Sequence, residues 1–483
     1  MTEVSVPLSG TDAARTAPRR RLTVWTLGVV AVTFLAGLLF GYDQGVISGA
    51  LPILTTDLGL STLQAEVITS WVTLGALFGA LVAGTVADRA GRRRAAIVAG
   101  VLFTLGAIME AFAPGASVLT VGRVVTGFGV GFASVVAPLY AAEMSPKRLR
   151  GRFVSSYQLA ITVGIFIAYL VDDALTGEGR WRAMFALAVI PGALLVVGFL
   201  IVPESARWLL KVGRREEALD ALTKLDPEVA KQELADVESD LEREAREGEA
   251  TWSEVFSKRL RRPLSIGIGL AVFQQVTGIN AIIYYANEIF ARAGFTTAQE
   301  QAKATLYAVG LVNVLATLIA IAWIDRLGRR PLLFAGLTGM AVSLAMVGVS
   351  FVAFSNTPTS TTSVTVGGVL TLVALVIFIA SFAFSLGPIT WTMISEIYPN
   401  RVRGKAVSLA TAVNWAAAFL VTQFFLSIVN AIGEATTFFL FSSLCIVAFV
   451  WAYFRVPETR GRSLEEIQEL WAPDQPSATQ SRV

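Results

Sequence analysis

This chain of 483 residues contains no histidine and a single cysteine, Cys445. One cysteine excludes an intramolecular disulfide and a cysteine-based metal cluster, so we expect no metal site. Because histidine is the side chain that ordinarily titrates near neutral pH, a proton carrier here must be a carboxylate or a rarer group. No nucleophile–base pair is apparent either, so the sequence does not indicate an enzyme.

Charged residues are also scarce. They make up 16% of the chain, against about 25% in soluble domains, while 54% of the residues are hydrophobic and the mean hydropathy is +0.63. A helix needs about 20 apolar residues to cross a bilayer. The alternative is a soluble α/β protein with many buried strands. The apolar stretches of this chain are too long and too rich in glycine to favour it. We count about twelve expected spans, at 24–54, 67–87, 95–112, 117–141, 153–171, 183–202, 263–287, 304–324, 406–433 and 435–454, with two more in the uncharged stretch 331–395.

The net charge of +3 comes from short basic clusters between the spans, so it does not indicate a nucleic-acid partner. The clusters fall on alternate connections, as cytoplasmic loops do. This pattern predicts a multi-pass protein of the cell membrane with both termini in the cytoplasm. No cleavable signal is apparent, and the first span can serve as its own insertion signal. The clusters lie at 19–21, 89–94, 147–152, 326–330 and 401–405.

Three motifs occur twice in the same order, which indicates two related halves. Repeated halves packed around a midplane site are a recurring plan of membrane transporters. The predicted fold is therefore all-α, with twelve transmembrane helices in two six-helix halves. The repeats are DRAGRR at 88–93 with DRLGRR at 325–330, Glu143 and RGR at 150–152 with Glu396 and RGK at 403–405, and PE at 203–204 with PE at 457–458.

Between the halves, residues 204–262 are rich in charge and place apolar residues at helical spacing. Short amphipathic helices on the cytoplasmic side are expected there. They act either as a solvated linker or as a latch across the two halves, and both interpretations stay open. The predicted segments are a cytoplasmic tail 1–21, an N-terminal bundle 22–203, the linker 204–262, a C-terminal bundle 263–456, and a cytoplasmic C-terminal helix and tail 457–483.

Two opposite charges lie inside otherwise apolar spans. Asp43 is the only charged residue between Arg21 and Asp57, and Arg123 is alone in the uncharged part of the fourth span. A charge at such depth costs roughly 2.5–3.5 kcal/mol on insertion scales, so it usually marks a proton, ion or substrate path. Both are expected in the outer half of the membrane, where they can meet. The alternative is a purely structural ion pair.

The chain resembles a sugar porter of the major facilitator superfamily, a bacterial proton-coupled monosaccharide symporter related to the facilitative glucose transporters. The resemblance covers residues 20–470. A single motif of this kind is only suggestive, whereas the whole series in order is specific for the family. One departure is Ala206, where the family usually has proline. The motifs are FGYD at 40–43, DRAGRR at 88–93, GR at 122–123 with the following glycines, the region 143–152, PESARW at 203–208, QQVTGIN at 274–280, GP at 387–388 with Trp391, and PETRG at 457–461.

A monosaccharide presents a ring of hydroxyl groups and an apolar face. Amides both donate and accept hydrogen bonds, and tryptophan offers a flat apolar surface. For Gln274 and Asn280 to converge, their helix must bend or unwind, which Gly278 permits. Alternatively, intramembrane amides bond only between helices, at about 0.6 kcal/mol each. The resemblance implies sugar contacts by Gln158, Gln274, Gln275, Asn280, Asn313 and Asn414, stacking or lid roles for Trp391 and Trp415, and a site-lining role for Phe40.

The resemblance also implies a coupling cycle. A proton reaching Asp43 from outside releases Arg123, sugar binding favours closure, and the contact reforms as the proton leaves inside. Facilitative members lack an acid at the position of Asp43, which favours symport. Salt bridges at the cytoplasmic span ends are implied to hold the outward-facing state closed inside, although the arginines also fit a plain topology signal. These residues are Asp88, Arg92, Glu143, Arg152, Asp325, Arg329, Glu396 and Arg403.

The expected function is therefore proton-coupled symport of a hexose or a pentose by alternating access. The driving force is the proton gradient, with no cofactor. We expect the bilayer, protons and a monosaccharide as the only partners, and a functional monomer. A uniporter on the same fold is the second hypothesis. A membrane sugar sensor that does not transport is the third, although such sensors usually carry long cytoplasmic tails.

Overall fold

The computed structural model describes residues 23–145, 150–248, 251–354 and 365–460. Within these ranges the chain is helical without strands, and twelve helices are long and apolar enough to cross a membrane. This confirms the predicted all-α membrane fold. The predicted N-terminal tail, and the C-terminal helix expected beyond residue 460, lie outside the described residues.

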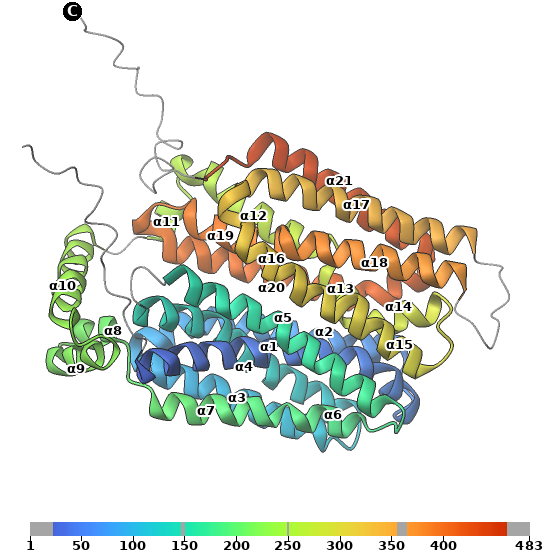
Figure 1. The fold of residues 1–483 in the computed structure, drawn as a ribbon, viewed down its shortest axis with the longest axis horizontal. Helices are drawn as coiled ribbons and strands as arrows, with labels where there is room; N and C mark the ends of the chain where they lie inside the picture. Colours follow the sequence, from blue (N-terminus) through green and yellow to red (C-terminus); the bar gives the residue numbers. More distant parts are fainter. Residues whose placement is uncertain (1–22, 146–149, 249–250, 355–364, 461–483) are drawn as a thin grey trace, which may run out of the picture.

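The first six spans form one side of the bundle, drawn blue to green in Figure 1. The last of them is interrupted once, at Ala188, just before Pro191. Its two helices therefore follow one another as a single bent span. The elements are α1 (Val24–Asp57), α2 (Thr62–Ala90), α3 (Arg92–Ala111), α4 (Ala116–Met144), α5 (Arg150–Thr176), α6 (Trp181–Leu187) and α7 (Val189–Ile201).

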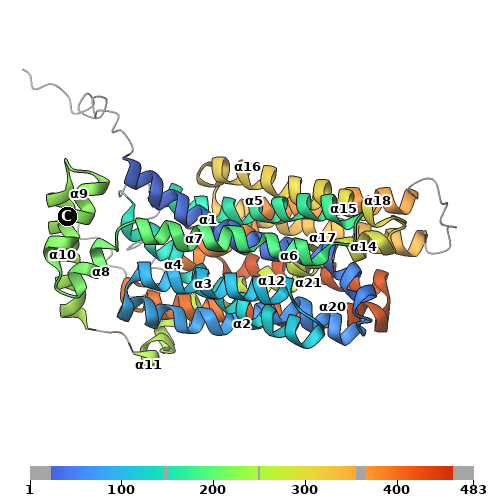
Figure 2. The ribbon, with the colours of Figure 1, turned by 90° about the horizontal axis from the view of Figure 1, so that it is seen from below.

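Four short helices and one 3₁₀ turn connect the two sides. Three of them pack on one another around Trp208, Leu222 and Leu234, beside one end of the bundle (Figures 1 and 2). We call this the linker end and the opposite end the distal end. The elements are α8 (Ala206–Lys211), α9 (Arg215–Leu225), α10 (Ala230–Glu247), α11 (Trp252–Val255) and η1 (Lys258–Leu260).

The last six spans form the other side, drawn yellow to red in Figure 1. Across the interface, α2 packs on α20, and α5 packs on a π-helical turn and α16. The elements are α12 (Arg261–Val276), α13 (Ile279–Tyr284), α14 (Ala286–Arg292), α15 (Ala298–Thr305), the π-helical turn η2 (Leu306–Leu311), α16 (Val312–Leu327), α17 (Arg329–Ala353), α18 (Val366–Phe384), α19 (Leu386–Glu396), α20 (Asn400–Ile432) and α21 (Glu434–Arg455).

The helix break expected at Gly278 is present. Gly278 has φ +96°, a left-handed conformation that glycine adopts without strain, and it separates α12 from α13. A second break at Ser385, with φ −124° and ψ −96°, separates α18 from α19. Across the first break, the side chain of Asn280 reaches that of Gln275 at 2.8 Å.

Glycines set the close contact between α2 and α4. A methyl group on Gly127 or Gly131 would overlap the backbone of α2 at Val72 or Ala76. Because no side chain separates the two helices there, their backbones approach directly. This packing fixes the position of α4, and therefore of Arg123, against α2.

Candidate functional site

Asp43 and Arg123 form an ion pair deep in the first half. The Nη1 atom of Arg123, on α4, lies 2.5 Å from Oδ1 of Asp43, on α1. Asp43 is 3% exposed and Arg123 is fully buried. An unpaired charge at this depth is costly, so each of the two groups stabilises the charged form of the other.

A second carboxyl group, that of Glu110 on α3, approaches the same guanidinium. Its Oε2 lies 3.7 Å from Nη1 of Arg123, and its Oε1 accepts a 2.7 Å hydrogen bond from the hydroxyl of Thr126. The Nε of Arg123 donates to the carbonyl of Ile68 at 3.1 Å, whereas its Nη2 has no hydrogen-bond partner among the described residues. One cation therefore lies near two carboxyl groups and is hydrogen-bonded to one of them.

Four buried amide side chains in the second half form a continuous chain of hydrogen bonds. Asn414, on α20, donates to Gln274 at 2.8 Å and accepts from Gln275 at 3.1 Å. Asn280, beyond the Gly278 break, donates to Gln275 at 2.8 Å. Such a chain presents donors and acceptors within apolar surroundings, as a polyhydroxylated ligand requires.

Gln44 links this amide chain to the first half. Its Nε2 donates to Oδ1 of Asn280 at 3.3 Å and to the hydroxyl of Tyr284 at 3.4 Å. Since Gln44 directly follows Asp43 on α1, the amide chain ends one residue away from the ion pair. Neither Gln44 nor Tyr284 is among the predicted site residues, although the position of Gln44 beside a buried acid is a signal for it.

The other predicted sugar contacts are only partly brought together. Phe40 of α1 and Trp415 of α20 pack across the two halves, with ring centroids 5.4 Å apart. Gln158 of α5 is partly buried and Asn313 of α16 is buried, and a contact of either amide with a sugar stays a prediction. Trp391, on α19, is 37% exposed and is not stacked on another described ring.

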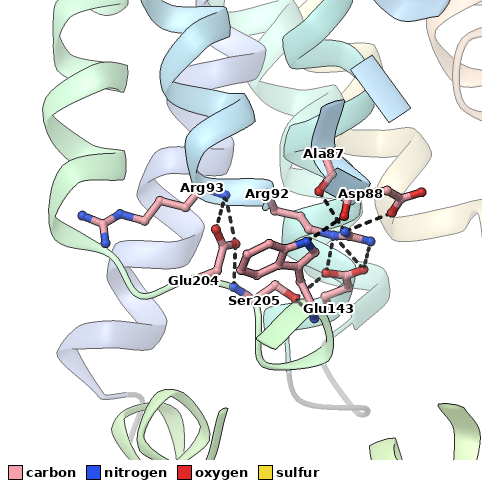
Figure 3. Close-up of polar contacts among 8 residues, drawn as sticks. Ala87, Asp88, Arg92, Arg93, Glu143, Glu204 and Ser205 are labelled. Carbon is pink, nitrogen blue, oxygen red and sulfur yellow. Dashed lines mark hydrogen bonds and ion pairs between the residues drawn. The ribbon is translucent and has the colours of Figure 1, made fainter. Parts of the chain in front are cut away.

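A polar cluster lies at the linker end of the first half (Figure 3). Arg92, at the start of α3, forms ion pairs with Glu143 at 2.9 Å and with Asp88 at 3.0 Å. Glu143 also accepts a hydrogen bond from the hydroxyl of Ser205. Glu204 accepts from the backbone N–H of Arg93 at 3.0 Å, which places a carboxylate at the N-terminus of α3.

The second half repeats this arrangement. Arg329, at the start of α17, lies 3.2 Å from Glu396, and Glu396 accepts a 2.8 Å hydrogen bond from the hydroxyl of Thr459. Glu458 accepts from the backbone N–H groups of Arg329 and Arg330, as Glu204 does in the first half. Glu204 and Glu458 belong to the repeated PE motif but are not among the predicted gating residues.

The ion pairs of these two repeated clusters join helices of the same half. Arg92 and Glu143 connect α3 to α4, and Arg329 and Glu396 connect α17 to α19. Arg403, in α20, donates to the backbone carbonyl of Tyr398. The side chains of Arg152 and Asp325 lie outside the described residues. The described ion pairs therefore stabilise each half separately, and a role between the halves stays a prediction.

Glu458 gives this end a pH dependence that can be measured. Burial by itself would raise the pKa of Glu458, but the backbone N–H groups of Arg460, Arg330 and Arg329 outweigh it and hold the pKa below 4.5. The contact therefore stabilises the fold above pH 4.5, and this stabilisation is lost as the pH falls through the lowered pKa. Because the carboxylate is only partly buried, it contributes on the order of 1 kcal/mol.

We expect Glu458→Gln to lower the apparent melting temperature of the purified protein at pH 7. The difference from the wild type should shrink below pH 4.5. Asp220→Asn is the matched control, because Asp220 is exposed on α9, where it forms an ion pair with Lys224 one turn away. A difference between Glu458→Gln and the wild type that stays constant from pH 7 to pH 4 contradicts the assignment.

Hydrogen bonds between the halves gather toward the distal end. Glu66, fully buried at the start of α2, accepts from the backbone N–H of Ser427 at 2.6 Å and from its hydroxyl at 2.7 Å. One turn further along α2, Ser70 donates to Gln423 at 2.7 Å. Gln299 donates to Asp173 at 2.7 Å in the same region. In this state, α2 and α5 are bonded to the second half near the distal end.

Comparison with known proteins agrees with this architecture. A profile of the family described as "Sugar (and other) transporter" matches residues 29–471. The arabinose-proton symporter of Bacillus subtilis (strain 168) is 38% identical over 446 residues, which cover 90% of this chain and 93% of that protein. The galactose-proton symporter of Escherichia coli (strain K12) is 38% identical over 445 residues, covering 92% and 94%.

Solved structures of similar fold include the xylose transporter XylE from E. coli in an inward open conformation. The TM-score is 0.77 at 29% sequence identity, with 92% of this chain and 100% of that chain covered. The fold and the buried polar site thus define a twelve-helix membrane transporter and not an enzyme. The chain belongs to the sugar porter family of the major facilitator superfamily.

Proposed function

We propose that this protein is a proton-coupled symporter of a hexose or a pentose that works by alternating access. Asp43 is the proton carrier and Arg123 is its partner. The observation that carries the proposal is the connection between the two polar systems, since Gln44 beside Asp43 donates to Asn280 of the amide chain. The similar proteins named arabinose-proton and galactose-proton symporters support a sugar and a proton as the transported species.

The linker end is the cytoplasmic end in this proposal, and both chain termini are cytoplasmic. The argument is the position of the basic residues, because Arg93, Arg330 and Arg401 lie at the helix ends beside the linker. A state whose halves are bonded near the distal end then faces the cytoplasm. The protein acts as a monomer and needs no cofactor, because the proton gradient drives transport.

The amide chain and the pair Phe40–Trp415 suit the two surfaces of a sugar. The amides of Gln274, Gln275 and Asn280 bond the hydroxyl groups, and the aromatic rings cover the apolar face. Gln158 and Asn313, from other spans, complete the contacts, and Trp391 closes over the sugar as the halves rock.

The proton step uses the ion pair. With the distal end open, a proton from outside neutralises Asp43 and frees Arg123, and bound sugar then favours closure. With the linker end open, the contact between Asp43 and Arg123 reforms and the proton leaves. One translocated charge is worth roughly 2.3 kcal/mol per 100 mV. At 1.4 kcal/mol per tenfold, this supports about fifty-fold accumulation per 100 mV.

Transport by the purified protein in proteoliposomes tests the proposal. We expect counterflow of at least one sugar among glucose, galactose, xylose and arabinose, and alkalinisation of the outside medium when that sugar is added. A protonophore should abolish accumulation and leave counterflow intact. Sugar flux that neither moves protons nor responds to the protonophore identifies a uniporter instead. Binding without flux identifies a sensor.

A further inference from the structure

Arg123 lies close to two carboxylates, those of Asp43 and Glu110. The proposed coupling cycle uses only that of Asp43. Glu110 is 1% exposed and comes from α3, whereas Asp43 comes from α1, so the two acids approach Arg123 from different helices. The closest oxygen of Asp43 is 2.5 Å from Nη1, and that of Glu110 is 3.7 Å from the same atom. The Nη2 group of Arg123 has no hydrogen-bond partner among the described residues, which leaves donors free for a second carboxylate.

The surroundings of Glu110 keep it next to Arg123. Gly122, which precedes Arg123 on α4, leaves the room that the Glu110 side chain occupies, because a methyl group there would lie 2.8 Å from its Cγ. The hydroxyl of Thr126, one turn further along α4, donates to Oε1 of Glu110. The other carboxylate oxygen, Oε2, is the one that faces the guanidinium. Glu110 is therefore held by packing and by one hydrogen bond, independently of Asp43.

No other acid bonds to this guanidinium among the described residues. Glu66 of α2 is bonded to Ser427, Arg182 of α6 bonds to Asp57 and to the carbonyl of Ala113, and α7 carries no ionisable residue. The charged or titratable groups that face Glu110 and Arg123 from the packed elements are Asp43 of α1 and, more weakly, Tyr284 of α13.

We propose that Glu110 is the alternate counter-ion of Arg123, the group that keeps the arginine compensated while Asp43 carries the transported proton. The inference rests on the proposed proton coupling. With both acids ionised, the three groups carry a net charge of −1. One proton from the distal solution binds the Asp43 carboxylate and brings the net charge to zero. Glu110 neither gains nor loses a proton in this step, and Arg123 shifts toward it.

Without Glu110, the same step would leave a lone buried cation. Breaking a buried pair in that way is strongly unfavourable, because it leaves one buried charge uncompensated. Glu110 therefore makes proton loading of Asp43 possible near neutral pH, through its effect on Arg123. It is a positioning residue that sets the pH at which the transporter loads its proton.

The pH dependence of sugar uptake into proteoliposomes tests this role. The substrate is the best transported of glucose, galactose, xylose and arabinose. We expect Glu110→Gln to shift the midpoint of proton-driven uptake to lower pH by roughly one unit or more. Glu110→Asp keeps the charge and should restore a midpoint close to the wild type. Thr126→Val removes the hydrogen bond that helps to hold Glu110 but keeps the carboxylate, and should shift the midpoint less than Glu110→Gln does.

A purely structural role for Glu110 predicts reduced amounts of protein and an unchanged midpoint. An unshifted midpoint in Glu110→Gln, or equal shifts in Glu110→Gln and Glu110→Asp, overturns the inference. If the Glu110→Gln protein does not insert into the membrane, the Gly122→Ala variant provides the test. The added methyl group displaces the Glu110 side chain and keeps both carboxylate charges. The midpoint of this variant should also fall, and an unshifted value overturns the inference. If uptake by the wild type changes neither with pH nor on addition of a protonophore, the proposed proton coupling itself is refuted.

Discussion

Replacing Asp43 with asparagine is expected to abolish uphill accumulation of sugar and to leave counterflow intact. Asparagine keeps the size of the side chain and a hydrogen bond to Arg123, but it cannot gain and lose a proton. The accumulation ratio should fall from tens-fold to about one, because the membrane potential contributes about 2.3 kcal/mol per 100 mV only if a charge moves with the sugar. Radiolabelled uptake into energised vesicles, with and without a protonophore, measures the effect.

Asp57→Asn is the matched control for this experiment. Asp57 ends the same helix, is half exposed, and bonds to Trp181 and Arg182 at the distal end. The chemical change is identical, but the group lies outside the buried ion pair. We expect normal accumulation. Full accumulation of sugar by the Asp43→Asn protein would contradict the coupling mechanism. An equal loss of accumulation in both variants would show that neutralising either acid of α1 disrupts the protein.

Replacing Gln275 with leucine is expected to raise the KM for sugar by on the order of 100-fold. Gln275 donates to Asn414 and accepts from Asn280, so leucine leaves the Oδ1 of Asn414 and the Nδ2 of Asn280 each without this hydrogen bond, and it removes the proposed contact to the sugar. Each buried polar group left unpaired costs about 1–3 kcal/mol, and a factor of ten in affinity is 1.4 kcal/mol. Initial rates of counterflow over a range of sugar concentrations give the KM.

The control for Gln275→Leu is Ser343→Ala. Ser343 is buried, as Gln275 is, but its hydroxyl donates to a carbonyl of its own helix, α17. Its loss should leave the KM unchanged. If Gln275→Leu keeps the wild-type KM while transporting normally, the amide chain is a structural contact between helices and the sugar binds elsewhere.

The span count and the helix break could be predicted because both depend on local sequence. A run of about 20 apolar residues has one favourable structure in a bilayer, and the twelve long helices are found in the order expected. The helix breaks at Gly278, the residue that was expected to permit a bend between Gln274 and Asn280. The repeated motifs also form matching contacts, since Glu204 and Glu458 each bond the start of a helix in their own half.

Glu110 shows what local sequence could not predict. It lies near the end of its span, where an acid is ordinarily solvated at the membrane surface. The structure buries it because α4 packs against α3 at Gly122, which brings Arg123 beside the carboxyl group. The bonds from Glu66 to Ser427 likewise depend on how α2 meets α20 across the interface. Nothing in the spacing of either acid indicates its partner.

The sequence by itself determined the class of this protein, its twelve spans, its two related halves, and the residue types of the proposed sugar and proton path. These follow from hydrophobic length, charge placement and repeated motifs, which act over short stretches of chain. Only the tertiary structure decided which groups share a contact: Gln44 with Asn280, and Glu110 with Arg123. These pairs come from different helices, so their distances depend on the packing of whole helices, which no local pattern encodes.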